Sequence, residues 1–204
     1  SCDSVRRDFA SIPAEKALPW VWRENLHLLQ DVIAEDYILD LDPTVKPLYG
    51  HQEGAVFGYS PQKPGRPSHC YHTLCIARLR LVLAVVVHPG GETSGSHSRS
   101  MLADYLTFVS SVKKPRLVRG DVSFGNESVI GDCEEADVRY LFKMRRSKRV
   151  RGEFRALLAD AGAWRDASEG WQCAERDVKL DSWERARRMV FARRPVEGMP
   201  KRKK

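Results

Sequence analysis

The stretch YILDLDPTVKPLYG, residues 37–50, sets two aspartates in a short run of β-forming residues that meets a proline. Side chains alternate along a strand, so Asp40 and Asp42 point to one face and the leucines beside them point to the other. The pattern predicts a strand over residues 37–42 that ends at Pro43, because proline cannot donate to a central ladder. Both carboxylates are therefore able to reach one site.

A third aspartate, Asp121, follows Gly120 at the end of a short predicted strand, residues 116–119. Ligands of open α/β sheets bind at the carboxyl ends of parallel strands, so Asp42 and Asp121 can face one point if their strands are neighbours. A site made of carboxylates and few other side chains suits Mg²⁺. A pair of such ions can hold the attacking and leaving oxygens of a phosphoryl transfer. Each acid also has a purely structural interpretation, as a turn or cap residue, and the spacing alone leaves both open.

The remaining pattern predicts an α/β protein in which helices alternate with strands. Apolar periodicity, Gly/Pro punctuation and capping residues predict the following order: a helix over residues 17–33, the strand 37–42, a Pro/Gly-rich loop over 58–68, a buried strand over 79–88, an amphipathic helix over 98–112, the strand 116–119, a helix that opens at Asn126, a strand in VRYLFKMR, a helical turn or two around 153–158, and short segments of β character over 160–166, 169–180 and 186–194.

Length and composition set the class of protein. A chain of 204 residues with 42% apolar content fits one domain, or one domain with a large insertion. Its longest apolar run, residues 81–87, is far short of a membrane helix. Five cysteines without paired spacing argue against a disulfide framework, so we expect a cytoplasmic location and no membrane partner.

Positive charge gathers in the last third of the chain. Residues 1–142 hold 15 Lys and Arg against 18 Asp and Glu, whereas residues 143–204 hold 19 against 9. Basic residues among Trp164, Trp171 and Trp183 are typical of a surface that binds nucleic-acid phosphates and stacks on bases. A solvated, salt-bridged face with core tryptophans explains the same residues, and charge does not separate the two.

Several stretches together closely resemble the DDE-type transposases of bacterial insertion sequences. The resemblance runs from about Ser4 to Arg194 and is carried, in order, by these segments: ILDLDPTVKPLYGHQEGAVFGYSPQKPGRPSHCYHT, LRLVLAVVV, RGDVSFGNE, YLFKMR, GWQ and SWERARRMVFARR. It implies an RNase H-like mixed sheet flanked by helices, with a basic, β-rich insertion. The implied regions are an N-terminal helical segment (1–36), the first part of the catalytic core (37–147) and the insertion (148–204).

The resemblance also implies a function and its residues. It implies a nucleotidyltransferase that uses Mg²⁺ or Mn²⁺, of two-metal type, to nick element ends and join them to target DNA. The Asp-x-Thr setting assigns the first acid to Asp42, with Asp40 in reserve, and the Arg-Gly-Asp run assigns the second to Asp121. Expected partners are the double-stranded DNA of element ends and target, and a second copy of the chain in a homodimer. The candidate DNA-binding residues are Lys148, Arg149, Arg151, Arg187, Arg188, Arg193 and Arg194.

The chain departs from the family pattern at the third acid. That acid is a Glu on a helix beyond the insertion, with a Tyr and then an Arg before it and a Lys after it at fixed spacing, and no residues here have that spacing. Glu175 and Glu184 lie in the strand-like insertion, and Glu127 is explained by the helix start. We therefore expect a missing closing helix and impaired strand transfer. A first residue other than methionine and a polar tail over residues 200–204 separately lead us to expect that both ends of the chain are cut. The alternative is a non-catalytic, DNA-binding or regulatory remnant of a transposase.

Other motifs favour no second chemistry. A cluster of His69, Cys70, His72 and Cys75 has no second ligand pair at zinc-finger spacing, and in a strand its members alternate between faces. The turn HPGGETSGSHS lacks the Lys-Ser/Thr ending of a phosphate-binding loop. Nor does the spacing of Ser123 to His88 or His97 suggest a catalytic triad.

Overall fold

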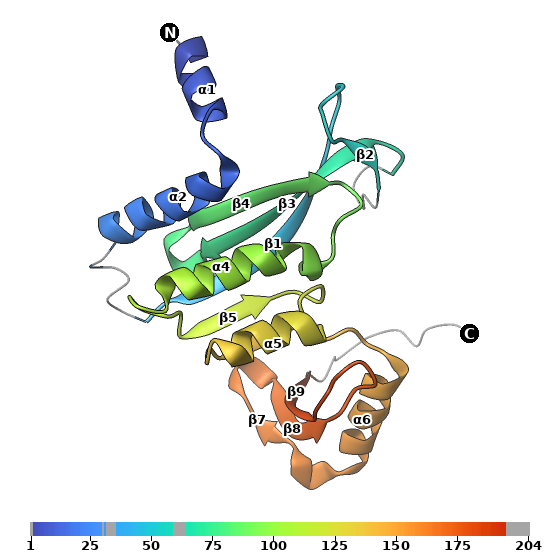
Figure 1. The fold of residues 1–204 in the computed structure, drawn as a ribbon. Helices are drawn as coiled ribbons and strands as arrows, with labels where there is room; N and C mark the ends of the chain where they lie inside the picture. The colour runs from blue at the N-terminus through green and yellow to red at the C-terminus, as the bar shows by residue number, and fades with distance from the viewer. Residues whose placement is uncertain (1, 30, 32–35, 59–63, 195–204) are drawn as a thin grey trace. The chain divides into compact units, whose positions relative to one another are not determined.

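The structure is a computed structural model that describes residues 2–29, 31, 36–58 and 64–194 (Figure 1). The chain divides into two compact units, Ser1–Met144 and Arg145–Lys204. Each unit is described by itself below. The predicted boundaries at residues 36 and 147 stay predictions.

A six-stranded mixed sheet forms the first unit. Its strands are β1 (Ile38–Pro47), β2 (Val56–Phe57), β3 (Pro67–Ile76), β4 (Leu81–Pro89), β5 (Leu117–Gly120) and β6 (Tyr140–Phe142). The order is β2-β3-β1-β5-β6, with β4 also paired to β3. Strands β1, β5 and β6 run parallel, whereas β3 is antiparallel to both β1 and β4. The carboxyl ends of β1, β4 and β5 therefore meet at one edge of the sheet.

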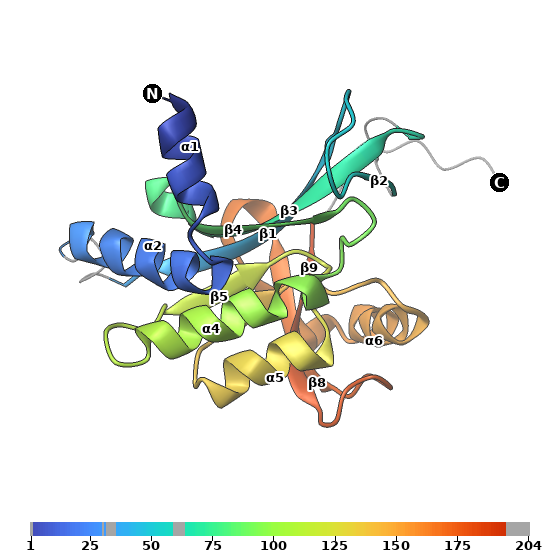
Figure 2. The ribbon, with the colours of Figure 1, turned by 45° about the horizontal axis from the view of Figure 1, so that its top comes forward.

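Helices cover one face of this sheet, as Figures 1 and 2 show for α2 (Ala14–Leu28), α4 (Arg99–Val109) and α5 (Glu127–Glu135). A further helix, α1 (Cys2–Ala10), precedes α2. Trp22 of α2 is buried and packs edge-on against Tyr105 of α4. The side chains that β1 sends to this face, Leu39 and Leu41, are also buried. A mixed sheet flanked by helices confirms the predicted α/β class.

Strand β1 corrects one prediction, because it continues through Pro43 to Pro47. The backbone N–H of Leu48 donates to the Pro67 carbonyl at 2.8 Å, so even-numbered positions of β1 bond to β3 and odd-numbered positions direct their nitrogens away from it. On that other side, pairing with β5 ends at Leu41. The prolines thus lie where no N–H is required, which is why the strand does not stop at Pro43.

The other local predictions hold to within a few residues. The helix predicted over 17–33 is α2, although residues 30, 32 and 33 lie outside the described part, as do residues 59–63 of the predicted loop. The predicted strand 79–88 is β4 and the predicted helix 98–112 is α4. Helix α5 opens at Asn126, whose side chain accepts a hydrogen bond from the Val129 N–H. Strand β3 was considered only as a possible setting for the His/Cys cluster.

The second unit packs a helix, α6 (Lys148–Ala159), with a three-stranded antiparallel sheet of β7 (Arg165–Asp166), β8 (Gln172–Val178) and β9 (Arg187–Arg193). The helix is longer than the predicted turn or two, because Ser147 caps it and Val150 and Leu157 form a buried stripe. Phe154 packs between Trp164 and Phe191. The β character predicted for residues 160–166, 169–180 and 186–194 is present in β7, β8 and β9.

Candidate active site

Asp42 lies exposed on the face of β1 opposite the helices. Leu39 and Leu41 are buried, whereas Asp40 and Asp42 point to the other face, as the alternation predicts. The Thr44 hydroxyl donates to Asp42 Oδ2 at 2.9 Å, and the Thr73 hydroxyl donates to the Asp42 carbonyl at 3.0 Å. Both the carboxylate and the main chain of Asp42 are thus held in place.

Asp121 is the first residue after β5 and is also exposed. Its Oδ1 accepts hydrogen bonds from the Ser123 N–H at 2.9 Å and the Ser123 hydroxyl at 2.6 Å, which makes a tight turn. The preceding Gly120 is required by packing, since a Cβ there would lie 2.7 Å from the ring of Phe124. Phe124 itself is buried, so the turn that carries Asp121 is fixed to the core.

The two acids follow paired positions on neighbouring strands. In the parallel register of β1 and β5, Leu41 lies opposite Gly120, and Asp42 and Asp121 are the next residues along each chain. Neighbouring strands lie about 4.8 Å apart in a sheet, so the two acids leave it side by side.

Asp40 has different surroundings from Asp42. Arg119 of β5 holds it in a two-pronged salt bridge, with Nε–Oδ1 at 2.6 Å and Nη2–Oδ2 at 2.8 Å. The hydrogen bonds to Asp40 raise the pKa of the Arg119 guanidinium. Both oxygens of Asp40 are occupied by this cation.

The pKa of the Cys75 thiol, which lies beside the two acids, is raised in part by their negative charges. Burial is the largest cause that raises the pKa of Cys75, followed by the charges of Asp40 and Asp42, whereas Arg119 opposes the shift. Cys75 pairs across the strands with Asp40, and Thr73 pairs with Asp42. Sequence reasoning named Thr44 only as part of a motif and missed Thr73, because the register of β3 against β1 has no signal in the sequence.

No third acid completes the pair among the residues that the structure describes. The one close cluster of three or more His, Cys, Asp or Glu side chains found there consists of His88, Glu92 and His97, which include neither aspartate. The His/Cys group that the sequence singled out divides between faces. Cys70 and His72 are buried, whereas His69 is half-buried and bonds to the Glu53 carbonyl.

The candidate DNA-binding residues of the second unit fall into two groups. Lys148, Arg151 and Arg194 are exposed, and Arg151 Nε donates only to the Ser147 carbonyl, at 3.4 Å. Four others are engaged by neighbours, as follows: Arg149 with Glu153, Arg188 with both oxygens of Glu175, Arg193 over Trp164 and with Gln172, and the buried Arg187 over Trp183.

The tryptophans divide in the same way. Trp164 and Trp183 are buried in the second unit, so they serve its core, whereas Trp171 is 41% exposed. The indole N–H of Trp164 donates to the Leu157 carbonyl at 2.8 Å and ties α6 to the turn before β7.

Within the described part of the chain, no helix is both long and apolar enough to span a membrane.

Comparison with solved structures gives distant likenesses. A chain of the simian T-cell lymphotropic virus intasome, solved with the PP2A regulatory subunit B56 gamma, is 15% identical, with a TM-score of 0.30. The HTLV-2 integrase catalytic core domain in complex with magnesium, in dimeric form, is 16% identical, with a TM-score of 0.30. The piggyBac transposase in a synaptic complex with hairpin DNA is 12% identical, with a TM-score of 0.41.

These matches cover 61%, 62% and 82% of this chain, and 40%, 73% and 36% of the three other chains in the same order. No curated protein matches the sequence. A family model described as Transposase DDE domain group 1 matches residues 6–199, nearly the whole chain. The chain therefore belongs to the transposase DDE domain family, group 1, a family of enzymes of DNA transposition.

Proposed function

We propose that this chain cleaves and joins DNA phosphodiester bonds with Mg²⁺ or Mn²⁺ held by Asp42 and Asp121. The observation that carries the proposal is the register of Leu41 opposite Gly120, which is followed on both strands by an exposed aspartate. Asp40, the reserve candidate, is less suited because Arg119 engages both of its oxygens. The double-stranded DNA of element ends and target is the proposed substrate.

The donor set fits a hard divalent ion. Asp42 and Asp121 are exposed carboxylates that accept hydrogen bonds from the hydroxyls of Thr44 and Ser123 and from the main-chain N–H of Ser123. Mg²⁺ prefers such oxygen ligands together with water and substrate phosphate. A bound ion, or the proposed pair of ions, supplies Lewis acidity that stabilises charge on the attacking and leaving oxygens.

The chain's own residues supply position. Thr44 and Ser123 orient the two carboxylates, and Thr73 fixes the main chain of Asp42 against β3. Asp40 binds the guanidinium of Arg119 in a salt bridge, so this cation does not pair with the carboxylate of Asp42 or Asp121.

The proposed DNA surface is the exposed side of α6. Lys148, Arg151 and Arg155 lie three and four residues apart, so they share one face of the helix. The first turn of α6 carries no acid, and cations there oppose the helix dipole. A DNA phosphate near this end would offset that cost, since helix N-termini favour anions.

A second candidate function is favoured because, in the described part of the chain, no third acid forms a close cluster with Asp42 and Asp121. It is the non-catalytic one, in which the basic unit binds DNA without cleaving it. Both candidates predict DNA binding, and only the first predicts nicking.

A nicking assay separates the two candidates. Supercoiled plasmid that carries the DNA flanking the coding sequence is incubated with Mg²⁺ and the chain or a variant. Asp42→Asn and Asp121→Asn are expected to lower the nicking rate at least about 100-fold, because each removes a charge that holds the metal. Asp104→Asn, at an exposed position of α4, is the matched control and should match the unaltered chain.

The outcomes divide clearly. Equal nicking by all four proteins would remove Asp42 and Asp121 from the site. Binding of the plasmid without nicking by the unaltered chain would favour the non-catalytic candidate.

A homodimer and a cytoplasmic location stay predictions. Light scattering of the purified chain tests the homodimer.

A further inference from the structure

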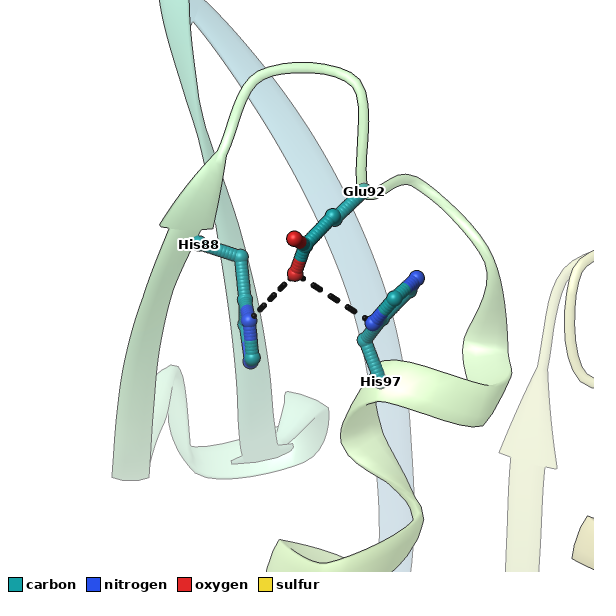
Figure 3. A group of neighbouring side chains, drawn as sticks. All are labelled: His88, Glu92 and His97. Carbon is teal, nitrogen blue, oxygen red and sulfur yellow. Dashed lines mark hydrogen bonds and ion pairs between the residues drawn. The ribbon is translucent and has the colours of Figure 1, made fainter. Parts of the chain in front are cut away.

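Three metal-binding side chains converge outside the Asp42 and Asp121 pair. His88 ends β4, Glu92 lies in the loop that follows, and His97 lies in a 3-10 turn, η2 (Gly95–Ser98), before α4. Their ligand atoms all lie within 4.8 Å of one another, and Figure 3 shows both rings directed at the Glu92 carboxylate. Nδ1 of His88 lies 2.9 Å from Glu92 Oε2, and Nδ1 of His97 lies 3.3 Å from the same oxygen.

These separations suit a tetrahedral ion. With metal–ligand distances of about 2.0 to 2.1 Å, two ligands of a tetrahedral Zn²⁺ lie about 3.3 Å apart. The observed 2.9 and 3.3 Å differ from that spacing by a few tenths of an ångström at most. The side chains are between 23% and 39% exposed, so an ion can enter and keep a water ligand.

A fourth histidine holds the loop in place. His72 on β3 is fully buried, and its Nε2–H donates to the Glu92 carbonyl at 2.7 Å. Its Nδ1 is then an acceptor, and the Ser98 hydroxyl donates to it. One ring thus fixes the main chain at Glu92 and the end of the turn that carries His97. Supporting contacts of this kind orient ligands before a metal binds.

The ligand set differs in class from that of the two aspartates. Two of the three ligands are imidazole nitrogens, which suit Zn²⁺ and its neighbours in the first transition row, whereas Mg²⁺ takes oxygen ligands. The loop also packs against the turn that carries Asp121, because a Cβ at Gly95 would lie 2.6 Å from the Ser123 carbonyl oxygen. An ion here would brace the loop beside that turn.

We propose that His88, Glu92 and His97 bind one divalent transition-metal ion of the Zn²⁺ class, with water in the remaining position. The proposed ligand atoms are His88 Nδ1, Glu92 Oε2 and His97 Nδ1, which approach one another in the structure. When the ion binds, each neutral imidazole carries its proton on Nε2, so that the Nδ1 lone pair ligates the ion in place of the hydrogen bond to Glu92. Its role is to fix the β4–α4 loop, independently of Mg²⁺ at Asp42 and Asp121.

Metal titration of the whole chain tests this site. The chain is stripped with EDTA, and Zn²⁺ alone is titrated by calorimetry in the absence of DNA. One equivalent is expected to bind, with millimolar Mg²⁺ unable to displace it. Glu92→Gln and His97→Ala should weaken binding by at least about 100-fold, since even loss of a supporting contact costs 10- to 100-fold. His51→Ala, at an exposed histidine outside the cluster, should bind as the unaltered chain does.

Cobalt spectroscopy identifies the ligands, because the chain also has five free cysteines. Co²⁺ in the proposed site should give d–d absorption without the thiolate-to-metal charge-transfer band. A thiolate band that persists in Cys2→Ser, or tight Zn²⁺ binding that survives Glu92→Gln and His97→Ala, would assign the metal elsewhere. Absence of binding to the unaltered chain would mean that the three side chains only hydrogen-bond.

Thermal unfolding controls for misfolding. Without metal, Glu92→Gln and His97→Ala should melt close to the unaltered chain, since both positions are partly exposed. Added Zn²⁺ should raise the melting temperature of the unaltered chain and of His51→Ala only, because binding to the native state stabilises it. An equal rise in all four proteins would overturn the site. None of these measurements depends on nicking, so the proposed function can fail separately.

Discussion

At the scale of single residues, Asp40 and Asp42 differ in what surrounds them. Both lie on the same face of β1, but Asp40 is bound by Arg119 at 2.6 and 2.8 Å, whereas Asp42 receives one hydroxyl, from Thr44. The first carboxylate is part of the cross-strand structure. The second accepts a neutral hydroxyl, so its oxygens are better placed to bind a ligand.

Asp40→Asn should lower the free energy of unfolding without stopping nicking. The salt bridge lies at the surface, with the Arg119 side chain 48% exposed, so the expected loss is below about 1 kcal/mol. Urea denaturation gives the stability and the plasmid assay gives the nicking rate. Asp42→Asn is the reciprocal control, with stability kept and nicking lost. Loss of nicking in Asp40→Asn at unchanged stability would make Asp40 the ligand.

Gly120→Ala should disturb the turn that carries Asp121. The added Cβ would lie 2.7 Å from the Phe124 ring, and overpacking of this kind costs about 1 to 3 kcal/mol. Nicking should fall as well, because Asp121 moves with the turn. Gly131→Ala in α5 is the matched control, since nothing lies within 4 Å of its Cβ, and helix propensity predicts a small gain. Equal stabilities of the two variants would contradict the packing argument.

At the scale of elements, a pair of tyrosines ties the start of β1 to α4. The Tyr37 hydroxyl donates to the Lys113 carbonyl at 2.9 Å and lies 3.2 Å from the Tyr105 hydroxyl. Burial raises the pKa of both, that of Tyr105 to about 12, and burial likewise raises the pKa of Cys133 in α5 to about 12.

These shifts predict a loss of stability at alkaline pH. Their ordinary pKa values are 10.0 for the tyrosines and 9.0 for Cys133, so above pH 9 the unfolded chain releases protons that the native chain keeps. Stability is therefore complete below pH 9 and falls as pH rises toward 12, by up to about 1.4 kcal/mol per pH unit for each group. Urea denaturation at pH 8, 9.5 and 10.5 measures the slope. Tyr105→Phe should make it shallower, and an unchanged slope would refute this origin.

Sequence patterns predicted most elements because their signals are local. Asn126 capping α5 and the apolar run of β4 each depend on neighbouring residues alone. The end of β1 was wrong because Pro43 is harmless only where β5 has already stopped pairing, a tertiary fact. Helix α6 was predicted too short, although the Ser147 cap and its buried stripe were present in the sequence.

At the scale of the whole molecule, DNA binding should depend on salt through the second unit. Replacing Lys148, Arg151 and Arg155 by alanine removes three exposed cations of α6, so the slope of log K against log salt should shrink by about 2 to 3. Fluorescence anisotropy with a labelled duplex over a series of NaCl concentrations gives the slope. Arg188→Ala is the control, because Glu175 already neutralises that charge, and should change the slope by much less than one. A slope unaffected by the triple change would place the DNA surface elsewhere.

The candidate sites differ in how far sequence reaches them. Asp42 and Asp121 were assigned from short motifs at strand ends, which can be recognised because their residues are contiguous in the sequence. His88 and His97 were considered only as partners of Ser123. Their approach to Glu92 depends on a loop folded back by His72 from another strand, and no spacing in the chain encodes that closure.

The two prolines of β1 have a consequence for self-association. Past Leu41 the strand has an open side, and an open side normally templates the addition of a further strand from another protein. Pro43 and Pro47 present no N–H there, so an incoming strand would find acceptors without the matching donors. The edge that holds Asp42 is thereby protected from β-strand addition.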